Sequence, residues 1–145
     1  MRRALKRAGH GEDEVEAAVT RLKGQRALDD ERFAEVFARS RLLHRGLGRN
    51  RIETELRQKG VARAVVKKGL SEALAFVSEA SALEAQARRY WRARTKDEPR
   101  ARVQKLWAFL LRRGYPADLV TRQLRTLWPR WSDALDGLEP VDEES

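Results

Sequence analysis

Residues 56–70 have the sequence LRQKGVARAVVKKGL, in which a leucine, a glycine, a valine and a leucine are separated by three, five and three residues. This spacing, with valine or leucine at the last position, occurs three times. The copies are Leu5, Gly9, Val15 and Val19; Leu56, Gly60, Val66 and Leu70; and Leu110, Gly114, Val120 and Leu124. Their glycines are 51 and 54 residues apart, a period typical of tandem supersecondary units that bury their apolar faces against one another. The pattern predicts a repeat protein.

Apolar residues recur at helical spacing along most of the chain. Between Glu14 and Lys23 they follow the i, i+3, i+4, i+7 pattern of an amphipathic helix. The same pattern predicts helices that begin near 28, 50, 62, 81, 99 and 116. No segment of useful length alternates as a half-buried strand does. The expected fold class is therefore all-α.

Capping residues predict where several of these helices begin. Asp29 and Asp30 are expected to cap a helix start, because an aspartate side chain accepts from free backbone N–H groups. A metal or acid–base role for this pair would need a third ligand, and the sequence offers none nearby. Asn50 and Ser81 are expected to cap later helices, and Pro99 suits a first helical turn.

Glycines predict where helices end. Gly60 and Gly114 are expected to stop helices in the left-handed conformation, as structural residues and not as ligand contacts. Residues 45–48 contain two glycines and end another helix. No strand precedes them and no third glycine follows at phosphate-loop spacing, so a flexible helix connection is expected there. Trp128 and Pro129 end the last helix.

A large aromatic residue marks the first helix of each complete unit. Phe37 and Trp91 each lie 23 residues before a repeat glycine, whereas Gly9 has only eight residues before it. We therefore expect tandem three-helix repeats in an elongated, curved array whose first repeat is incomplete, either for want of its leading helix or because the chain begins late. The expected divisions are 1–28 for the incomplete repeat, 29–77 and 78–131 for the second and third repeats, and 132–145 for an acidic, disordered tail.

Charge is distributed unevenly. The net charge is +9, and residues 1–32 are nearly balanced. Residues 33–68 hold 10 basic and 3 acidic side chains, and residues 88–130 hold 13 and 3. Two basic runs in successive repeats favour a polyanionic partner, either nucleic acid or an acidic protein surface. Simple solvation of helix surfaces is the alternative.

Composition argues against several function classes. The chain has no cysteine, which excludes disulfides and thiolate metal sites. His10 and His44 lack zinc-ligand spacing or a nucleophile partner, so no metal, no cofactor and no enzymatic activity are expected. No apolar run approaches the roughly 20 residues that a membrane span requires, and no apolar signal core follows Met1. A soluble cytoplasmic protein is expected.

Spaced motifs give the chain a family resemblance. The first run is Leu28-Asp29-Asp30-x-x-Phe33-Ala34, Arg39-x-Arg41, Gly46-x-Gly48 and Ile52-x-x-Glu55-Leu56-x-x-Lys59-Gly60-Val61, and the second is Phe109-Leu110-x-Arg112-Arg113-Gly114-Tyr115. They resemble the signature of RecX, the bacterial regulator of the RecA recombinase, over nearly all of residues 1–128. The resemblance implies a curved, modular protein that binds along the RecA–DNA filament and suppresses RecA ATPase, strand exchange and coprotease activity.

Basic side chains are the candidate binding residues for RecA or nucleic acid, because guanidinium forks suit carboxylates and phosphates. In the second repeat they are Arg39, Arg41, Arg45, Arg49, Arg51, Arg57, Lys59 and Arg63, and in the third Arg88, Arg89, Arg92, Arg94, Arg112 and Arg113. Some could instead shield apolar surface with their stems. Trp91 and Trp107 are expected in the core, whereas Trp128 and Trp131 suit either packing or an interface.

The sequence leaves two functions open. One is a monomeric, non-enzymatic regulator that lies on a RecA nucleoprotein filament and possesses basic faces for RecA and for single- or double-stranded DNA. The other is a free-standing helical module that binds DNA or RNA through phosphates and loses affinity steeply with salt. The acidic segment 136–144 is expected to compete with DNA for the basic face.

Overall fold

The structure, a computed structural model, describes residues 12–138 of the 145-residue chain. These residues form α2 (Glu12–His44), α3 (Arg49–Gln58), α4 (Arg63–Phe76), α5 (Glu79–Ala93), α6 (Pro99–Arg112), α7 (Ala117–Leu127) and the 3-10 helix η1 (Pro129–Leu135). No strand occurs between residues 12 and 138, and the predicted all-α repeat fold is confirmed. Leu5, Gly9 and His10 lie outside the described residues.

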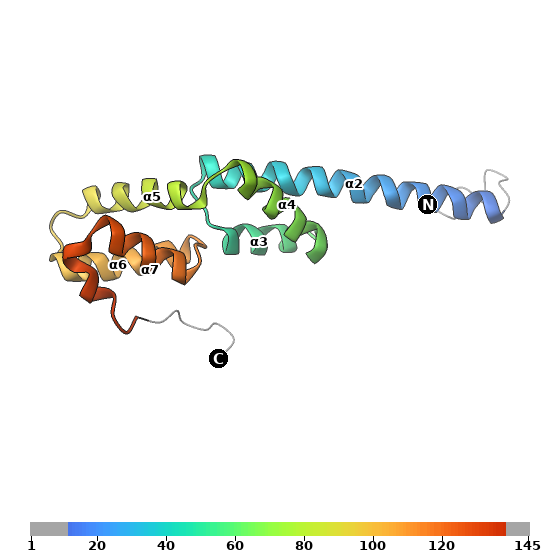
Figure 1. The fold of residues 1–145 in the computed structure, drawn as a ribbon. Helices are drawn as coiled ribbons and strands as arrows, with labels where there is room; N and C mark the ends of the chain where they lie inside the picture. Colours follow the sequence, from blue (N-terminus) through green and yellow to red (C-terminus); the bar gives the residue numbers. More distant parts are fainter. Residues whose placement is uncertain (1–11, 139–145) are drawn as a thin grey trace.

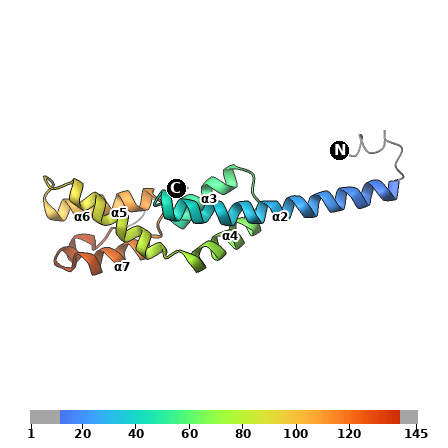
Figure 2. The ribbon, with the colours of Figure 1, turned by 90° about the horizontal axis from the view of Figure 1, so that it is seen from above.

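The helices build two small bundles, each around its own core. The central bundle is made of the second half of α2 with α3 and α4, and the C-terminal bundle is made of α5, α6, α7 and η1. The repeat motif supplies equivalent core positions, Leu56, Val66 and Leu70 in one bundle and Leu110, Val120 and Leu124 in the other. The bundles follow each other along an elongated molecule, and the first half of α2 extends beyond α4, away from both (Figures 1 and 2).

α2 is one continuous helix of 33 residues, so the predicted helix start at Asp29 and Asp30 is wrong. No proline interrupts it, and the single Gly24 costs about 1 kcal/mol, too little to break a long helix. Packing on α4 then fixes its second half. Ala34 is fully buried, and a Cβ at Gly69 of α4 would collide with it, so the two helices approach closely at this point.

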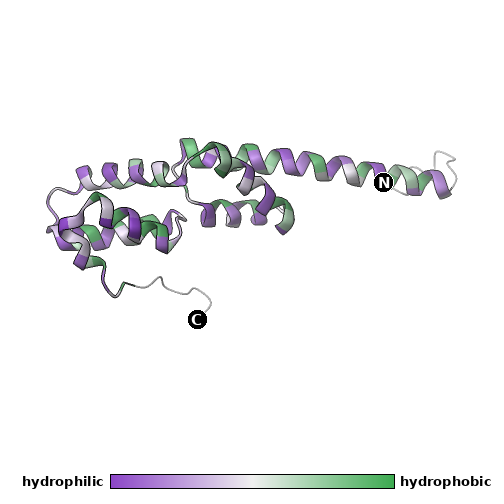
Figure 3. Ribbon diagram, in the orientation of Figure 1, coloured by the Kyte–Doolittle hydropathy of each residue, from purple (hydrophilic) through white to green (hydrophobic). Residues whose placement is uncertain are grey.

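The first half of α2 carries both polar and apolar residues. Hydrophilic and hydrophobic residues alternate along its turns beyond α4 (Figure 3). Leu22 and Leu28 are among the large apolar side chains that remain exposed. The continuous helix therefore carries a partly apolar surface past the end of the central bundle.

Most predicted helix ends are confirmed, although two caps differ. Gly60 and Gly114 adopt φ values of +86° and +99°, and Pro99 stands in the first turn of α6 behind an N-cap at Glu98. The N-cap of α5 is Ser78, whose hydroxyl accepts from the Ser81 N–H, so α5 begins before the predicted cap at Ser81. Asn50 is no cap either, because it lies inside α3.

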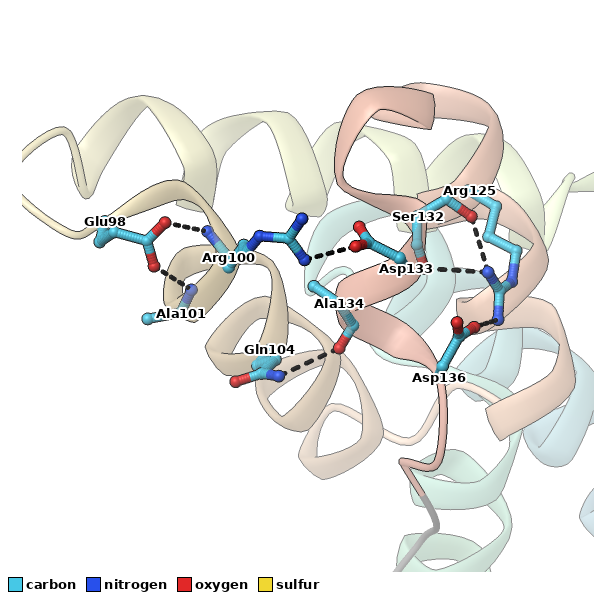
Figure 4. A network of polar contacts seen from close by, with 9 residues as sticks. All are labelled: Glu98, Arg100, Ala101, Gln104, Arg125, Ser132, Asp133, Ala134 and Asp136. Carbon is cyan, nitrogen blue, oxygen red and sulfur yellow. Dashed lines mark hydrogen bonds and ion pairs between the residues drawn. The ribbon is translucent and has the colours of Figure 1, made fainter.

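η1 closes the C-terminal bundle and corrects the expectation that residues 132–135 belong to a disordered tail. Leu135 is buried, and polar contacts hold η1 against α6 and α7 (Figure 4). They include Arg100 to Asp133 at 2.6 Å, Gln104 to the Ala134 carbonyl at 3.1 Å, and Arg125 to the Ser132 hydroxyl at 2.6 Å. Residues 139–145 of the acidic segment lie outside the described residues.

Two repeat glycines provide a matched test of what each one does. A Cβ at Gly60 would meet nothing within 4 Å, whereas a Cβ at Gly114 would collide with the backbone of Arg51. Gly60→Ala should therefore lower the free energy of unfolding by about 1 kcal/mol, the cost of a left-handed alanine. Gly114→Ala should lower it by about 3 kcal/mol, because steric overlap is added. Urea denaturation measures both values, and equal losses would contradict this account.

Candidate functional site

The two bundles meet where the start of α3 lies against the end of α6. The N-cap residue of α3, Gly48, makes no side-chain cap. Instead its N–H donates to the Arg113 carbonyl at 2.9 Å, and the Asn50 N–H donates to the Gly114 carbonyl at 2.9 Å. Free N–H groups at a helix start need acceptors, and here the other bundle provides them. We call this contact, residues 46–50 against Glu79 and residues 113–115, the joint.

Glu79 completes the capping of α3 from the first turn of α5. Its carboxylate accepts from the Arg49 backbone N–H at 2.8 Å and from the Arg49 Nε at 2.9 Å. The Glu79 side chain is 4% exposed, and a buried carboxylate is stable where it is paired and hydrogen-bonded. Its negative charge also lies at the positive end of the α3 dipole, which adds to the attraction.

Arg113 and Tyr115 also hold the connection at residues 46–48. The Tyr115 hydroxyl donates to the Gly46 carbonyl at 2.6 Å, and the Arg113 guanidinium donates to the carbonyls of Arg45 and Gly46. Gly48 is buried, and a Cβ there would collide with the backbone of Gly114 and Tyr115. The expectation of a flexible helix connection is therefore wrong, because the glycines permit close contact between backbones.

Tyr115 remains a hydrogen-bond donor over a wide pH range. Burial is the main cause that raises the pKa of its hydroxyl far above the usual value. A raised pKa in the folded state means that the fold favours the neutral hydroxyl. The contribution of Tyr115 to the free energy of unfolding is therefore fully present below the ordinary tyrosine pKa of about 10. This contribution is lost as the pH rises from that value through the raised pKa of the folded state.

Six of the fourteen predicted binding residues are engaged within the protein. Arg39 pairs with Glu35, Arg41 and Arg51 with Glu55, Arg49 with Glu79, and Arg88 with Glu84, while Arg113 holds the joint carbonyls. Arg41 also lies over the Phe37 ring, 4.2 Å from its centroid. Arg49 and Arg113 therefore have a structural role, and their guanidinium groups are less available to a partner.

The other eight have no ion pair within residues 12–138. They are Arg45, Arg57, Lys59, Arg63, Arg89, Arg92, Arg94 and Arg112, all of them exposed. Arg94 lies over the Tyr90 ring and Lys59 near that of Phe37, contacts that leave their charges accessible. Cations without a carboxylate partner are the ones best able to attract an external anion.

A groove crosses the joint and brings Arg112, one of these cations, close to Arg51 of the other bundle. We call it the joint groove; it has a volume of about 530 Å³ and is lined by Asn50, Arg51, Thr54, Glu55, Gln58, Leu111, Arg112 and Gly114. A smaller hollow lined by Arg41, Glu55, Gln58 and Lys59 shares two of these residues. Both bundles contribute, and the lining is mostly polar. Such a surface suits an extended anionic chain better than a compact apolar ligand.

A second groove lies between α3 and α4, with a volume of about 720 Å³. Leu70 and Leu74 provide an apolar floor, while Arg63 and Lys67 carry charge at the same groove. Of the predicted residues, the two grooves and the adjoining hollow gather Arg41, Arg49, Arg51, Lys59, Arg63 and Arg112. The arginines of α5 line none of these three.

The tryptophans serve mainly the C-terminal bundle. Trp107 is buried, and its indole N–H donates to Thr121 at 3.1 Å, as a core position predicts. Trp91 is partly buried and stacks on Trp128, with ring centroids 4.6 Å apart. Trp131 also packs against this core.

Residues 12–138 contain no cluster of three histidine or acidic side chains that could hold a metal ion. Among the same residues no helix has the length and apolarity for a membrane span.

Glu55 restrains two of the cations, which gives a testable prediction. It lies 3.3 Å from the Arg41 Nε and 3.5 Å from the Arg51 Nε. Glu55→Gln should release both guanidinium groups and tighten binding of a labelled single-stranded oligonucleotide several-fold at low salt, with a steeper salt dependence. Fluorescence anisotropy at several salt concentrations measures this.

The matched control is Glu53→Gln, which changes the charge of the same helix equally. Glu53 lines the groove between α3 and α4 and has no ion pair within residues 12–138. An equal effect of the two substitutions would show that net charge matters and that release of Arg41 and Arg51 does not.

Known proteins share this architecture. The sequence profile of the RecX second three-helix domain matches residues 29–74, and that of the RecX third three-helix domain matches residues 78–124. A crystal structure of regulatory protein RecX is similar with a TM-score of 0.64 and 25% identity, over 86% of this chain and 61% of that one.

Curated relatives agree with these matches. Regulatory protein RecX of Halorhodospira halophila is 40% identical over 80% of this chain and 70% of its own length. Regulatory protein RecX of Thermobifida fusca is 36% identical over 84% of this chain and 65% of its own length, so the chain spans slightly less than two thirds of that relative. With two domain profiles matched in order and a relative of this identity covered over more than two thirds, the chain belongs to the RecX family of regulatory proteins.

Proposed function

We propose that this protein binds the RecA–DNA filament and mainly inhibits RecA ATPase, strand exchange and coprotease activity. It acts as a monomeric, non-enzymatic regulator in the cytoplasm. In this proposal the central and C-terminal bundles contain the second and third three-helix repeats, residues 29–77 and 78–131, and residues 1–28 belong to the first repeat.

The observation that carries the proposal is the joint groove, where cations of two successive bundles line one surface. Arg51 comes from α3 and Arg112 from the end of α6. A filament presents anionic groups at regular intervals, so a surface that spans two bundles can contact more than one of them. Family membership supports RecA as the partner, since the RecX resemblance implies it.

Removal of charge from the joint groove tests the proposal. The double variant Arg51→Gln, Arg112→Gln should need about tenfold more protein to suppress the ATPase activity of RecA on single-stranded DNA. Two partly exposed contacts of about 0.7 kcal/mol each correspond to this factor. The measurement is a titration of each protein into preassembled filaments at moderate salt.

Arg21→Gln, Arg26→Gln provides the control, because it removes the same charge from an exposed part of α2 outside both grooves. It should inhibit as the unchanged protein does. No inhibition by the unchanged protein at stoichiometric amounts would reject the proposed function, and equal weakening of both variants would reject the joint groove as its site.

The rival function is a free-standing module that binds nucleic acid without RecA, as the two basic bundles alone would allow. It differs in salt dependence, since binding through phosphates falls steeply with added salt. Anisotropy with bare single-stranded DNA and with RecA-coated DNA separates the two. Equal affinity for both at moderate salt would favour the rival.

A further inference from the structure

We propose that the joint sets the selectivity of this protein for long partners, with Glu79 and Tyr115 as its positioning residues. The joint holds the two bundles in one fixed orientation, so that their separate basic surfaces act as a single extended surface. The consequence for binding rests on the proposed function, whereas the fixed orientation rests on the structure of the chain alone.

The contacts at the joint include direct hydrogen bonds between the backbones of the two bundles. They involve backbone groups on both sides, Gly48 and Asn50 as donors and Arg113 and Gly114 as acceptors. A hinge would be expected to leave the connecting glycines free, yet Gly46 and Gly48 are buried. Side chains added at these positions would collide with Gln86 and with the backbone of Gly114 and Tyr115. Movement of one bundle against the other would therefore break these backbone hydrogen bonds.

Glu79 and Tyr115 hold the two sides of the same short connection. Glu79 accepts from Arg49 just after the buried glycines, and Tyr115 donates to the carbonyl of Gly46 just before Leu47. Both residues are buried, at 5% and 1% exposure. Neither lines the joint groove, so their substitution alters the orientation of the bundles without removing a residue that lines it.

A fixed orientation of the two bundles raises the affinity for a long, repeating partner but not the affinity for a short one. When two binding surfaces are rigidly matched to a repeating ligand, the second contact forms at a high effective concentration. A loose joint spreads the surfaces over many orientations and loses part of this advantage. A short ligand that touches one bundle does not have this advantage in either case.

Distances between spin labels test the fixed orientation directly. The chain has no cysteine, so Ala64→Cys on α4 and Ala85→Cys on α5 introduce two labels at exposed positions, one in each bundle. Pulsed electron paramagnetic resonance should give one narrow distance distribution. Glu79→Gln and Tyr115→Phe should each broaden it, and Tyr115→Phe keeps the buried ring in case Glu79→Gln destabilises the fold. A broad distribution in the otherwise unchanged protein, or unchanged widths in both variants, would overturn the proposal.

The matched control is Glu84→Gln, which makes the same change in the same helix. Glu84 forms an exposed pair with Arg88, away from the joint. It should leave the distance distribution unchanged. Circular dichroism of every variant verifies that the helices remain folded, so that broadening reports orientation and not unfolding.

Binding then tests the consequence. Glu79→Gln and Tyr115→Phe should bind RecA filaments on long single-stranded DNA about tenfold more weakly than Glu84→Gln, and should bind a short oligonucleotide of about six nucleotides equally well. Broadened distances with unchanged filament affinity would refute the selectivity role. Absence of filament binding by the unchanged protein would refute the proposed function and this role together, while the distance measurements would still decide whether the joint is rigid.

Discussion

The structure depends on a helix whose first N–H groups are capped by another bundle. α3 has no capping side chain of its own, and its acceptors are the carbonyls of Arg113 and Gly114 and the carboxylate of Glu79. Buried N–H groups at a helix start raise the free energy of the folded state when they lack acceptors. The central bundle is therefore most stable when the C-terminal bundle provides acceptors for the N–H groups of α3. The same contact forms the joint groove. The hydrogen bonds at the start of α3 therefore both stabilise the joint and shape the joint groove.

Local signals in the sequence predicted most of the fold. Left-handed glycines at 60 and 114 and Pro99 at the start of α6 follow from conformational preferences of single residues, and these were confirmed. The errors have a common physical origin. Asp29 and Asp30 have good capping chemistry, yet an uninterrupted helix packed on α4 outweighs it. The cap expected at Asn50 is replaced by the carbonyls of Arg113 and Gly114 and the carboxylate of Glu79, which lie far away in the sequence and which no local pattern contains.

The candidate site was less accessible to sequence reasoning than the fold. Charge counts located the two basic regions, but a count does not show which cations are already paired. Arg49 and Arg113 looked equivalent to Arg112, although they hold the joint while Arg112 lines the groove. Glu79 and Tyr115 were missed because their partners lie 30 and 69 residues away. The Gly46-x-Gly48 spacing was the available signal, since closely spaced glycines also occur where two backbones touch.

Continuity of α2 makes the length of residues 22–33 matter more than their identity. Each residue of an α-helix adds about 1.5 Å and turns the chain by about 100°. One inserted residue would thus rotate the preceding turns by more than a quarter of a circle relative to both bundles, whereas a loop would absorb it. Substitutions of exposed residues in this segment should therefore cost little, whereas an insertion or deletion should change the direction in which the first half of α2 faces relative to both bundles.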